Sequence, residues 1–287
     1  MGKVSWILGI AKRVYRRLER RMYSGGATKY LLESLLTRNV NTGDNKIKVP
    51  PKASSVEVSE MMEIIPISSY GGCIWDIGAH IGHFSIEVSG KFDKVIAFEP
   101  SAENYGYLKD NIERNEIDNI NPLNIAVGDE DGESVMFIDP RPGSGIHSLS
   151  KDKMLKKEER VNVMTIDSLM EVYETPKVIK IDVEGAELDV IRGAKKTIRN
   201  KNVEWLIEVH SERTGKRRDR IGQHGGKVEE LYDILKRNNY TLYGSKEGKC
   251  FEIEIEKDSL PLYWFASKKM EYNTDKYYFD NLFNKPR

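Results

Sequence analysis

Between residues 72 and 210, short apolar runs alternate with longer amphipathic segments, and this alternation restricts the fold more than any other feature of the chain. Short apolar runs are typical of parallel strands that are buried on both faces. The segments Ser101–Asn115 and Ala186–Arg199 have helical periodicity, and Ser101 is well placed as an N-cap. The alternation therefore predicts right-handed crossovers and an α/β fold with a doubly wound, mostly parallel sheet. The expected strands are Cys73–Ile77, Lys94–Phe98, Leu123–Val127, Val178–Asp182 and Trp205–Val209.

The C-terminal part of the chain has a different pattern. A helix is expected over Val228–Asn238, and three apolar or alternating runs follow it at Tyr240–Tyr243, Phe251–Ile255 and Leu262–Ser267. Antiparallel strands that close one edge of the sheet would explain these runs. We therefore expect an antiparallel C-terminal edge, followed by a tail at 271–287 that has no clear period.

The N-terminal segment is basic, with nine Lys or Arg against two acids between Met1 and Val40. Its apolar residues recur at helical spacing, which predicts a basic amphipathic helix. The helix could pack on the domain, lie on an anionic membrane or contact a phosphate-bearing partner. We expect three parts: a helical extension and linker at 1–55, a main domain at 56–270 and the tail. The apolar positions are Trp6, Ile7, Ile10, Val14, Leu18 and Met22.

The overall composition excludes several classes of protein. The formal net charge is zero, so a globally basic nucleic-acid binder gains no support. Apolar runs are shorter than the roughly 18 to 20 residues that a membrane helix needs, and basic residues interrupt the N-terminus where a secretory signal would need an apolar stretch. The two cysteines, Cys73 and Cys250, have no metal-ligand spacing. We expect a cytoplasmic protein without a specific nucleic-acid partner, with membrane association through the basic helix as the open alternative.

A glycine-containing turn follows the first expected strand and precedes the helical stretch His83–Phe92. It reads Asp76-Ile77-Gly78-Ala79-His80-Ile81-Gly82. Glycines allow a tight turn and a close approach of the backbone to a ligand, and the start of the helix offers free N–H groups. We expect Asp76, Gly78, Ala79, His80 and Gly82 to contact a nucleotide-like cofactor, although the spacing differs from the G-x-G-x-x-G of dinucleotide folds.

Glu99 ends the second expected strand, 17 residues after Gly82. A carboxylate at this place in a doubly wound fold can accept hydrogen bonds from both ribose hydroxyls. The alternative is an exposed acid that favours the start of a helix. A third strand end carries Asn124 and Ala126, which would lie beside the same crevice and line an adenine pocket, unless the segment is only an ordinary strand followed by a turn.

Charged residues gather at the ends of the last two expected parallel strands. The octet Lys180-Ile181-Asp182-Val183-Glu184-Gly185-Ala186-Glu187 places four charges where an apolar strand ends, which is costly unless they are paired or used. Glu208 and His210 alternate on the next strand and point to the same side. His210 has the acid–base range to accept a proton from a hydroxyl. The simpler alternatives are a structural histidine and first-turn acids at Glu184 and Glu187.

These stretches, in this order, resemble the FkbM family of methyltransferases over roughly residues 73–210. The motifs are DIGAHIGHFS, VIAFEP, NIAVGDEDG, VMTIDSL, KIDVEGAELDVIRGA and IEVH. The resemblance implies a class I methyltransferase fold, which is a Rossmann-like doubly wound sheet, with S-adenosylmethionine as methyl donor and an oxygen acceptor on a sugar, polyketide or other small molecule. By position, Asp76, Gly78 and Gly82 would approach the methionine and ribose of the cofactor, and Glu99 would hold the ribose. Asp182 and Glu184 would shape the transfer site, with Asp182 also in contact with the cofactor. His80 stands where such turns often have Asn.

The sulfonium already activates the methyl group, so the enzyme mainly has to align an acceptor oxygen and help to remove its proton. We expect Asp182, Glu184, Glu208 and His210 to form the polar floor of the acceptor pocket, with His210 or Asp182 as the base. The carboxylates could instead hold a divalent cation that polarises the hydroxyl. Two further readings stay open: an NAD-type oxidoreductase on a similar sheet, and a non-catalytic module that binds the cofactor.

The segment between 139 and 160 interrupts the alternation of strands and helices. Residues 139–148 contain several Pro and Gly, and a charged run follows at 151–160. We expect a mobile loop that covers the acceptor site, with His147 and Ser148 as candidate substrate contacts. The basic run Arg213–Arg220 could meet an anionic acceptor or form a solvated face. We expect the acceptor to be a small molecule or a glycan, and no motif in the sequence identifies it.

Overall fold

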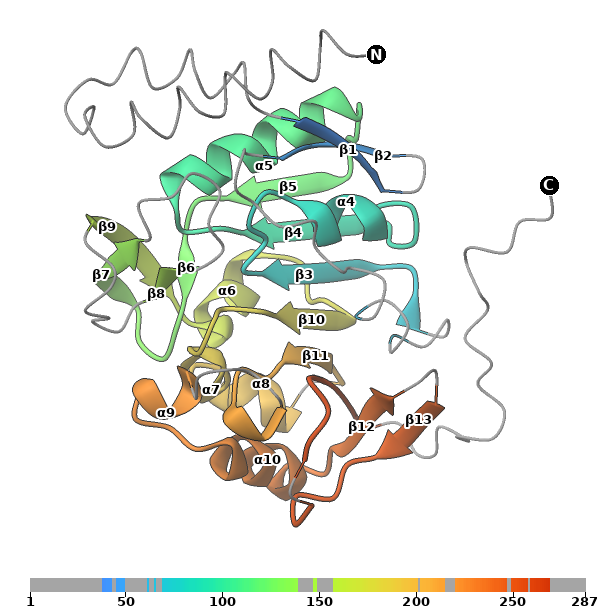
Figure 1. Ribbon diagram of the computed structural model, residues 1–287, viewed down its shortest axis with the longest axis vertical. Coiled ribbons are helices and arrows are strands. Elements are labelled where there is room, and N and C mark those ends of the chain that lie inside the picture. Colours follow the sequence, from blue (N-terminus) through green and yellow to red (C-terminus); the bar gives the residue numbers. More distant parts are fainter. Residues whose placement is uncertain are drawn as a thin grey trace, which may run out of the picture.

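The computed structural model describes residues 38–42, 45–49, 61, 65, 69–138, 147–148, 157–200, 202–214, 220–246, 249–257 and 259–268. Figure 1 shows one large twisted sheet with helices against it and a smaller sheet on the left of the view. A two-stranded antiparallel ladder of β1 (Arg38–Thr42) and β2 (Asn45–Val49) lies beside α4 and α5. The predicted N-terminal helix and the tail at 271–287 lie outside the described residues. None of the described helices has the length and apolar character needed to span a membrane.

The large sheet has eight strands in the order β13-β12-β14-β11-β10-β3-β4-β5. β3, β4, β5, β10 and β11 run parallel, whereas β14 is antiparallel to both of its neighbours and β13 is antiparallel to β12. This order confirms the predicted class I methyltransferase sheet with an antiparallel C-terminal edge. The strands are β3 (Cys73–Ile77), β4 (Lys94–Phe98), β5 (Ile120–Leu123), β10 (Val178–Ile181), β11 (Glu204–Glu208), β12 (Thr241–Lys246), β13 (Lys249–Glu252) and β14 (Tyr263–Ser267).

The direction of the chain across the sheet reverses between β3 and β10. The chain proceeds from β3 outwards to β4 and β5, and then returns to the other side of β3 to form β10 and β11. In open α/β sheets, ligands bind outside the carboxyl ends of the strands at such a switch point. The carboxyl ends of β3, β4, β10 and β11 are therefore the place to look for a site.

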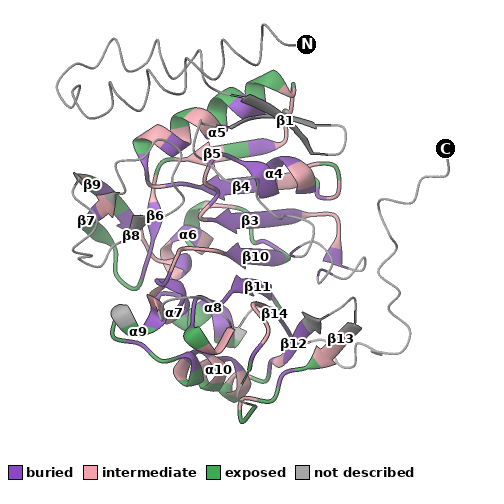
Figure 2. Cartoon of the chain, in the orientation of Figure 1, coloured by how far each residue is buried: buried purple, intermediate pink, exposed green. Residues whose placement is uncertain are grey.

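Helices cover both faces of the sheet, and the strand sequences alternate accordingly. Ile74 packs in the cluster that includes α4 and α5, while the adjacent Trp75 packs with α6, α7, α8 and α10 on the opposite face. The central strands are buried on both faces (Figure 2). The helices are α4 (His83–Val88), α5 (Ala102–Arg114), α6 (Ile166–Val172), α7 (Glu187–Arg192), α8 (Lys195–Asn200), α9 (Arg220–Gln223) and α10 (Val228–Arg237), with a short 3-10 helix η2 at Glu212–Thr214. Ser101 caps α5 as predicted, because its side chain accepts a hydrogen bond from the backbone N–H of Asn104.

The expected strand Leu123–Val127 is divided between two sheets. β5 ends at Leu123, whereas β6 (Ala126–Val127) joins the small sheet of order β6-β9-β7-β8. Asn124 lies at the break, and its amide donates to the carbonyl oxygens of Glu99 and Pro100 at 2.9 Å each. The chain therefore leaves the large sheet where a side chain ties it to the end of β4. The other strands of the small sheet are β7 (Gly132–Ile138), β8 (His147–Ser148) and β9 (Lys157–Met164).

The prediction of a mobile loop between 139 and 160 is partly wrong. Residues 157–160 begin β9, which pairs antiparallel with β7, and His147 and Ser148 form β8 beside β7. Glu158 and Arg160 are exposed, whereas Val161 and Val163 are buried. An antiparallel sheet can have one solvated face, so a charged run does not exclude a strand there. The two residues proposed as substrate contacts, His147 and Ser148, pair with Ile138 and Phe137.

Candidate active site

The turn after β3 is shaped by a close contact with the end of β10. Gly78 has φ +79°, and a Cβ atom at this position would lie 1.8 Å from the carbonyl oxygen of Asp182. The backbone N–H groups of Gly78 and Ala79 both donate to the carbonyl oxygen of Phe98 at the end of β4. Only glycine fits at position 78, and the turn thereby joins three strand ends.

Asp76 and Lys180 form a buried ion pair beneath this turn. Lys180 Nζ lies 2.8 Å from Asp76 Oδ1 and donates to the carbonyl oxygen of Gly78 at 2.9 Å, while Ser85 Oγ donates to Asp76 Oδ2 at 2.5 Å. Burial opposes the charged form of Lys180, but the carboxylates of Asp76 and Asp182 outweigh it and raise its pKa. Asp76 is fully buried. It therefore stabilises the turn through its buried contacts with Lys180 and Ser85. A direct contact of Asp76 with a cofactor stays a prediction.

Glu99 follows β4 and closes the other side of the turn. Its Oε2 accepts the backbone N–H of His80 at 2.8 Å, and its Oε1 accepts that of Ser101 at 2.9 Å. Burial raises the pKa of Glu99 to about 7, against the opposing effect of these hydrogen bonds. The side chain of Asn104 also donates a hydrogen bond to this carboxylate. With two lone pairs on each oxygen, the group can still accept a further hydrogen bond. Glu99 is thus suited to accept a ribose hydroxyl.

The remaining residues predicted to bind a cofactor have different surroundings. His80 has φ +54° and lies within the turn, and Gly82 immediately precedes α4. Ala126 is buried with Met136, Val161 and Val163 in the core of the small sheet. An adenine pocket at Asn124 and Ala126 stays a prediction, because the amide of Asn124 donates to the carbonyl oxygens of Glu99 and Pro100 after β4.

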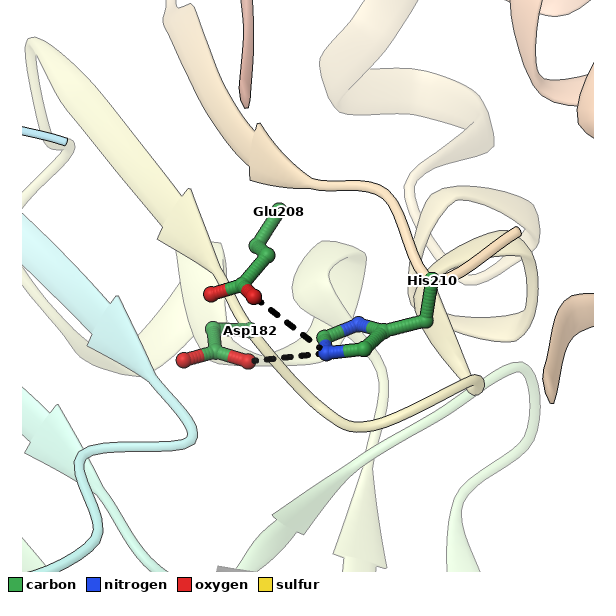
Figure 3. A group of neighbouring side chains, drawn as sticks. All are labelled: Asp182, Glu208 and His210. Atoms are coloured by element: carbon green, nitrogen blue, oxygen red, sulfur yellow. Dashed lines mark ion pairs between the residues drawn. The ribbon is translucent and has the colours of Figure 1, made fainter. Parts of the chain in front are cut away.

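A histidine surrounded by carboxylates lies on the other side of the switch point. His210 Nε2 is 3.2 Å from Glu184 Oε2, 3.4 Å from Glu208 Oε1 and 3.9 Å from Asp182 Oδ1. Figure 3 shows the ring edge turned towards Asp182 and Glu208. The structure thus brings together all four residues that the sequence predicted for the polar floor: Asp182, Glu184, Glu208 and His210.

The opposite nitrogen of this ring is held by Glu187, which the sequence did not assign to the site. Glu187 Oε1 lies 2.6 Å from His210 Nδ1 and accepts the backbone N–H of Gly185 at 2.9 Å. Burial of the ring lowers the pKa of His210, but Glu187, Asp182 and Glu208 outweigh this effect and raise it to about 8. Glu187 therefore fixes the orientation of the ring and favours its charged form.

Two other residues lie in the site, although the sequence assigned neither of them an individual role. Lys180 was noted only as one charge of the octet, although its burial on an apolar strand could have indicated an internal partner. Arg220, at the start of α9, forms an ion pair with Glu184. Its backbone N–H donates to the carbonyl oxygen of His210 at 3.1 Å, which fixes α9 beside the site. The basic run 213–220 thus contributes a cation at the edge of the cluster.

The chain is similar to known methyltransferases in sequence. The chain is 29% identical over 140 residues to a hexuronic acid methyltransferase, AglP, of Haloferax volcanii, covering 48% of this chain and 56% of that protein. It is 28% identical over 142 residues to Methyltransferase 1 of Beauveria bassiana, covering 42% and 57%. The chain thus spans little more than half the length of these curated relatives. A crystal structure of an FkbM methyltransferase from Methylobacillus flagellatus aligns with a TM-score of 0.42 at 18% identity, over 68% of this chain and 42% of that one.

The family assignment depends on the sequence that builds the site. Residues 76–242, more than half of the chain, match the Methyltransferase FkbM domain. This range begins at Asp76 and includes Glu99, the octet from Lys180 to Glu187, and His210. The chain therefore belongs to the FkbM methyltransferase family.

Proposed function

We propose that this protein transfers the methyl group of S-adenosylmethionine to a hydroxyl oxygen of a saccharide or another small acceptor. The proposal depends on one observation: two groups of candidate site residues lie next to each other at the switch point. The glycine turn and Glu99 lie at the ends of β3 and β4, and the polar floor around His210 lies at the ends of β10 and β11. The carbonyl of Asp182 packs directly against Gly78 and links the two.

The glycine turn and Glu99 fit the cofactor. The contact of Gly78 with the carbonyl oxygen of Asp182 keeps the turn next to the polar floor, and the buried Glu99 carboxylate can accept a hydrogen bond from a ribose hydroxyl. The bound cofactor supplies an electrophilic methyl group. The neighbouring carboxylates provide a negative surrounding that favours its sulfonium charge.

The polar floor receives the acceptor hydroxyl. Above pH 8, where His210 is mostly neutral, its Nε2 takes the proton of this hydroxyl. At lower pH a carboxylate oxygen of Asp182 takes it, in each case as the new O–CH3 bond forms and the S–CH3 bond breaks. Glu187 holds the imidazole from behind, and thereby keeps Nε2 directed towards Asp182 and Glu208 (Figure 3). Orientation of the hydroxyl in line with the sulfur–methyl bond supplies most of the rate enhancement.

The acceptor class proposed here is a uronic acid or a glycan that contains one. The proposal is supported by the name of the Haloferax volcanii relative. It is also supported by Arg220, a partly exposed cation at the edge of the polar floor, since guanidinium groups recognise carboxylates. The basic N-terminal segment would suit an acceptor carried at an anionic membrane surface.

The test is transfer of a labelled methyl group from S-adenosylmethionine to a panel of neutral sugars and uronic acids. We expect His210→Gln to lower kcat by about 10²- to 10⁴-fold, because glutamine cannot take the proton. The matched control is His224→Gln, since His224 follows α9 and its Nδ1 lies 3.8 Å from Asp189 Oδ2.

Three outcomes would contradict the proposal. Full activity in His210→Gln would exclude His210 as the base, and full activity also in Asp182→Asn would exclude the polar floor. Binding of NAD in place of S-adenosylhomocysteine would favour an oxidoreductase. Tight binding of S-adenosylhomocysteine without transfer to any acceptor would favour a non-catalytic module.

A further inference from the structure

Three potential metal ligands converge at the ends of two adjacent strands. Asp182 follows β10, Glu208 ends β11 and His210 lies two residues further along. The pairing of Ile181 with Ile207 fixes the register of these strands and places Asp182 level with Glu208. One oxygen from each acid and one ring nitrogen of His210 lie within 4.8 Å of one another. The backbone therefore presents the three groups to one point.

The imidazole is held in the orientation that a metal ligand needs. Glu187, whose side chain is fully buried, lies 2.6 Å from Nδ1 of His210. A metal-binding histidine commonly donates its other ring N–H to a carboxylate, which fixes the tautomer and directs the free nitrogen at the metal. In Figure 3 that nitrogen, Nε2, faces Asp182 and Glu208.

The spacing inside the cluster leaves room between the three groups. Nε2 lies 3.4 Å from Glu208 Oε1 and 3.9 Å from Asp182 Oδ1, which is longer than a good hydrogen bond. The other oxygen of Asp182, Oδ2, faces Lys180 at 3.7 Å, so Oδ1 is the oxygen directed at the ring. Bonds of about 2.0–2.2 Å to a small cation would need only a small inward movement of the two flexible acids.

The charge around the ring also favours a cation. Glu187 and Glu184 flank the ring in addition to the two acids, and Arg220 pairs with Glu184. Within the part of the chain that the structure describes, these carboxylates outnumber the cations that touch them. Buried carboxylates are stable when they are paired or when they coordinate a metal.

We propose that Asp182, Glu208 and His210 bind one divalent cation, and that this cation holds the acceptor oxygen beside the methyl donor. Two carboxylates and one imidazole suit Mn²⁺, since carboxylates favour Mg²⁺ and Mn²⁺ while imidazole favours first-row transition metals. Asp182 is the most exposed of the three, at 28% of its side chain, against 10% for Glu208 and 3% for His210. The open coordination positions thus face the acceptor.

This inference rests on the proposed function and refines it. A bound cation lowers the pKa of a hydroxyl that contacts it. In the cation-loaded enzyme His210 is then a ligand, and the proton of the acceptor hydroxyl passes to solvent water instead of to Nε2. The competing explanation is that the acids serve only the sulfonium of the cofactor, and it predicts no metal binding in the absence of cofactor.

The experiment is a titration of the full chain, free of cofactor, with Mn²⁺. Binding is measured as the loss of the electron paramagnetic resonance signal of the free ion. We expect saturable binding of one ion per chain, weakened at least about 10-fold by Glu208→Gln, which keeps the shape of the side chain but removes its charge. Asp182→Asn, at the more exposed ligand, should weaken it similarly. The control is Glu212→Gln, since Glu212 is an exposed acid on η2. Thermal unfolding of each variant confirms that it is folded.

The outcomes separate this inference from the proposed function. Absence of saturable Mn²⁺ binding to the wild type, or equal binding by wild type and both ligand variants, overturns the metal site. Methyl transfer that continues in a strong chelator would then leave the proposed function intact. Conversely, saturable Mn²⁺ binding by a chain that cannot bind S-adenosylhomocysteine would support the metal site and refute the methyl-transfer proposal.

Discussion

At the scale of single residues, the proposed function makes cofactor binding depend on the charge of the Glu99 carboxylate. Burial raises its pKa to about 7, while hydrogen bonds from the backbone N–H groups of Ser101 and His80 act in the opposite direction. An ionised carboxylate accepts hydrogen bonds from ribose hydroxyls more strongly than the protonated acid does. Glu99 is therefore poised to lose its charge just below neutral pH, where its hold on the ribose weakens.

This gives a pH-dependent prediction. Between pH 8 and pH 6 the ionised fraction of a group with a pKa near 7 falls from about nine-tenths to about one-tenth. We expect the affinity for S-adenosylhomocysteine, measured by calorimetry, to fall about 10-fold over this range. Glu99→Gln should bind weakly at both pH values, with little change between them. Equal wild-type affinities at pH 6 and pH 8 would rule out this role of Glu99.

The same residue has a predictable effect on stability. Because its folded pKa lies above the ordinary value of 4.5, ionisation of Glu99 disfavours the folded state as pH rises from about 4.5 to 7. Glu99→Gln removes this charge. The variant should therefore be as stable as the wild type or more stable at pH 8, which separates loss of binding from loss of folding.

The sequence predicted which residues carry the site better than it predicted what each one touches. Asp182, Glu184, Glu208 and His210 could be identified because polar residues that end apolar strands must meet at the switch point. The roles of Glu187 and Lys180 could not, because burial of a charged side chain depends on tertiary packing. Glu187 begins α7, where an acid is equally expected on the surface beside the helix dipole.

At the scale of elements, the apolar patterns in the sequence predicted the central parallel strands. They did not predict where one element breaks into two. The expected helix Ala186–Arg199 is two helices, α7 and α8, separated at Gly193. The break occurs where a Cβ on Gly193 would lie 2.0 Å from the carbonyl oxygen of Gly128, after β6. Such an approach between segments 65 residues apart leaves no local signal except the glycine itself.

The break at Gly193 can be tested by one substitution. Gly193→Ala inserts a methyl group against a backbone oxygen that cannot move independently of the small sheet, so we expect a loss of about 1–3 kcal/mol in the free energy of unfolding. Denaturant unfolding measures it. The matched control is Gly90→Ala, because a Cβ at Gly90 has no atom within 4 Å. If both variants lose the same stability, the contact with Gly128 does not determine the break.

At the scale of the whole molecule, the switch point divides the large sheet into two halves, which the pairing of β3 with β10 joins. β4 and β5 lie on one side of β3, and β10, β11 and the antiparallel edge lie on the other. The Gly78–Asp182 contact and the pair of Lys180 with Asp76 both cross this line. A cofactor bound in the crevice would cross it as well, and would stabilise both halves together.

We therefore expect S-adenosylhomocysteine to raise the melting temperature of the whole domain in one cooperative transition. A ligand that binds only the folded state at 100 times its Kd adds about 2.7 kcal/mol, which corresponds to roughly 5–10 °C for a domain of about 200 residues. Scanning calorimetry at pH 8 measures this shift, and Glu99→Gln at the same ligand concentration should show a much smaller one. Two separate transitions, with only the first moved by ligand, would mean that the halves unfold independently and that the cofactor contacts β3 and β4 alone.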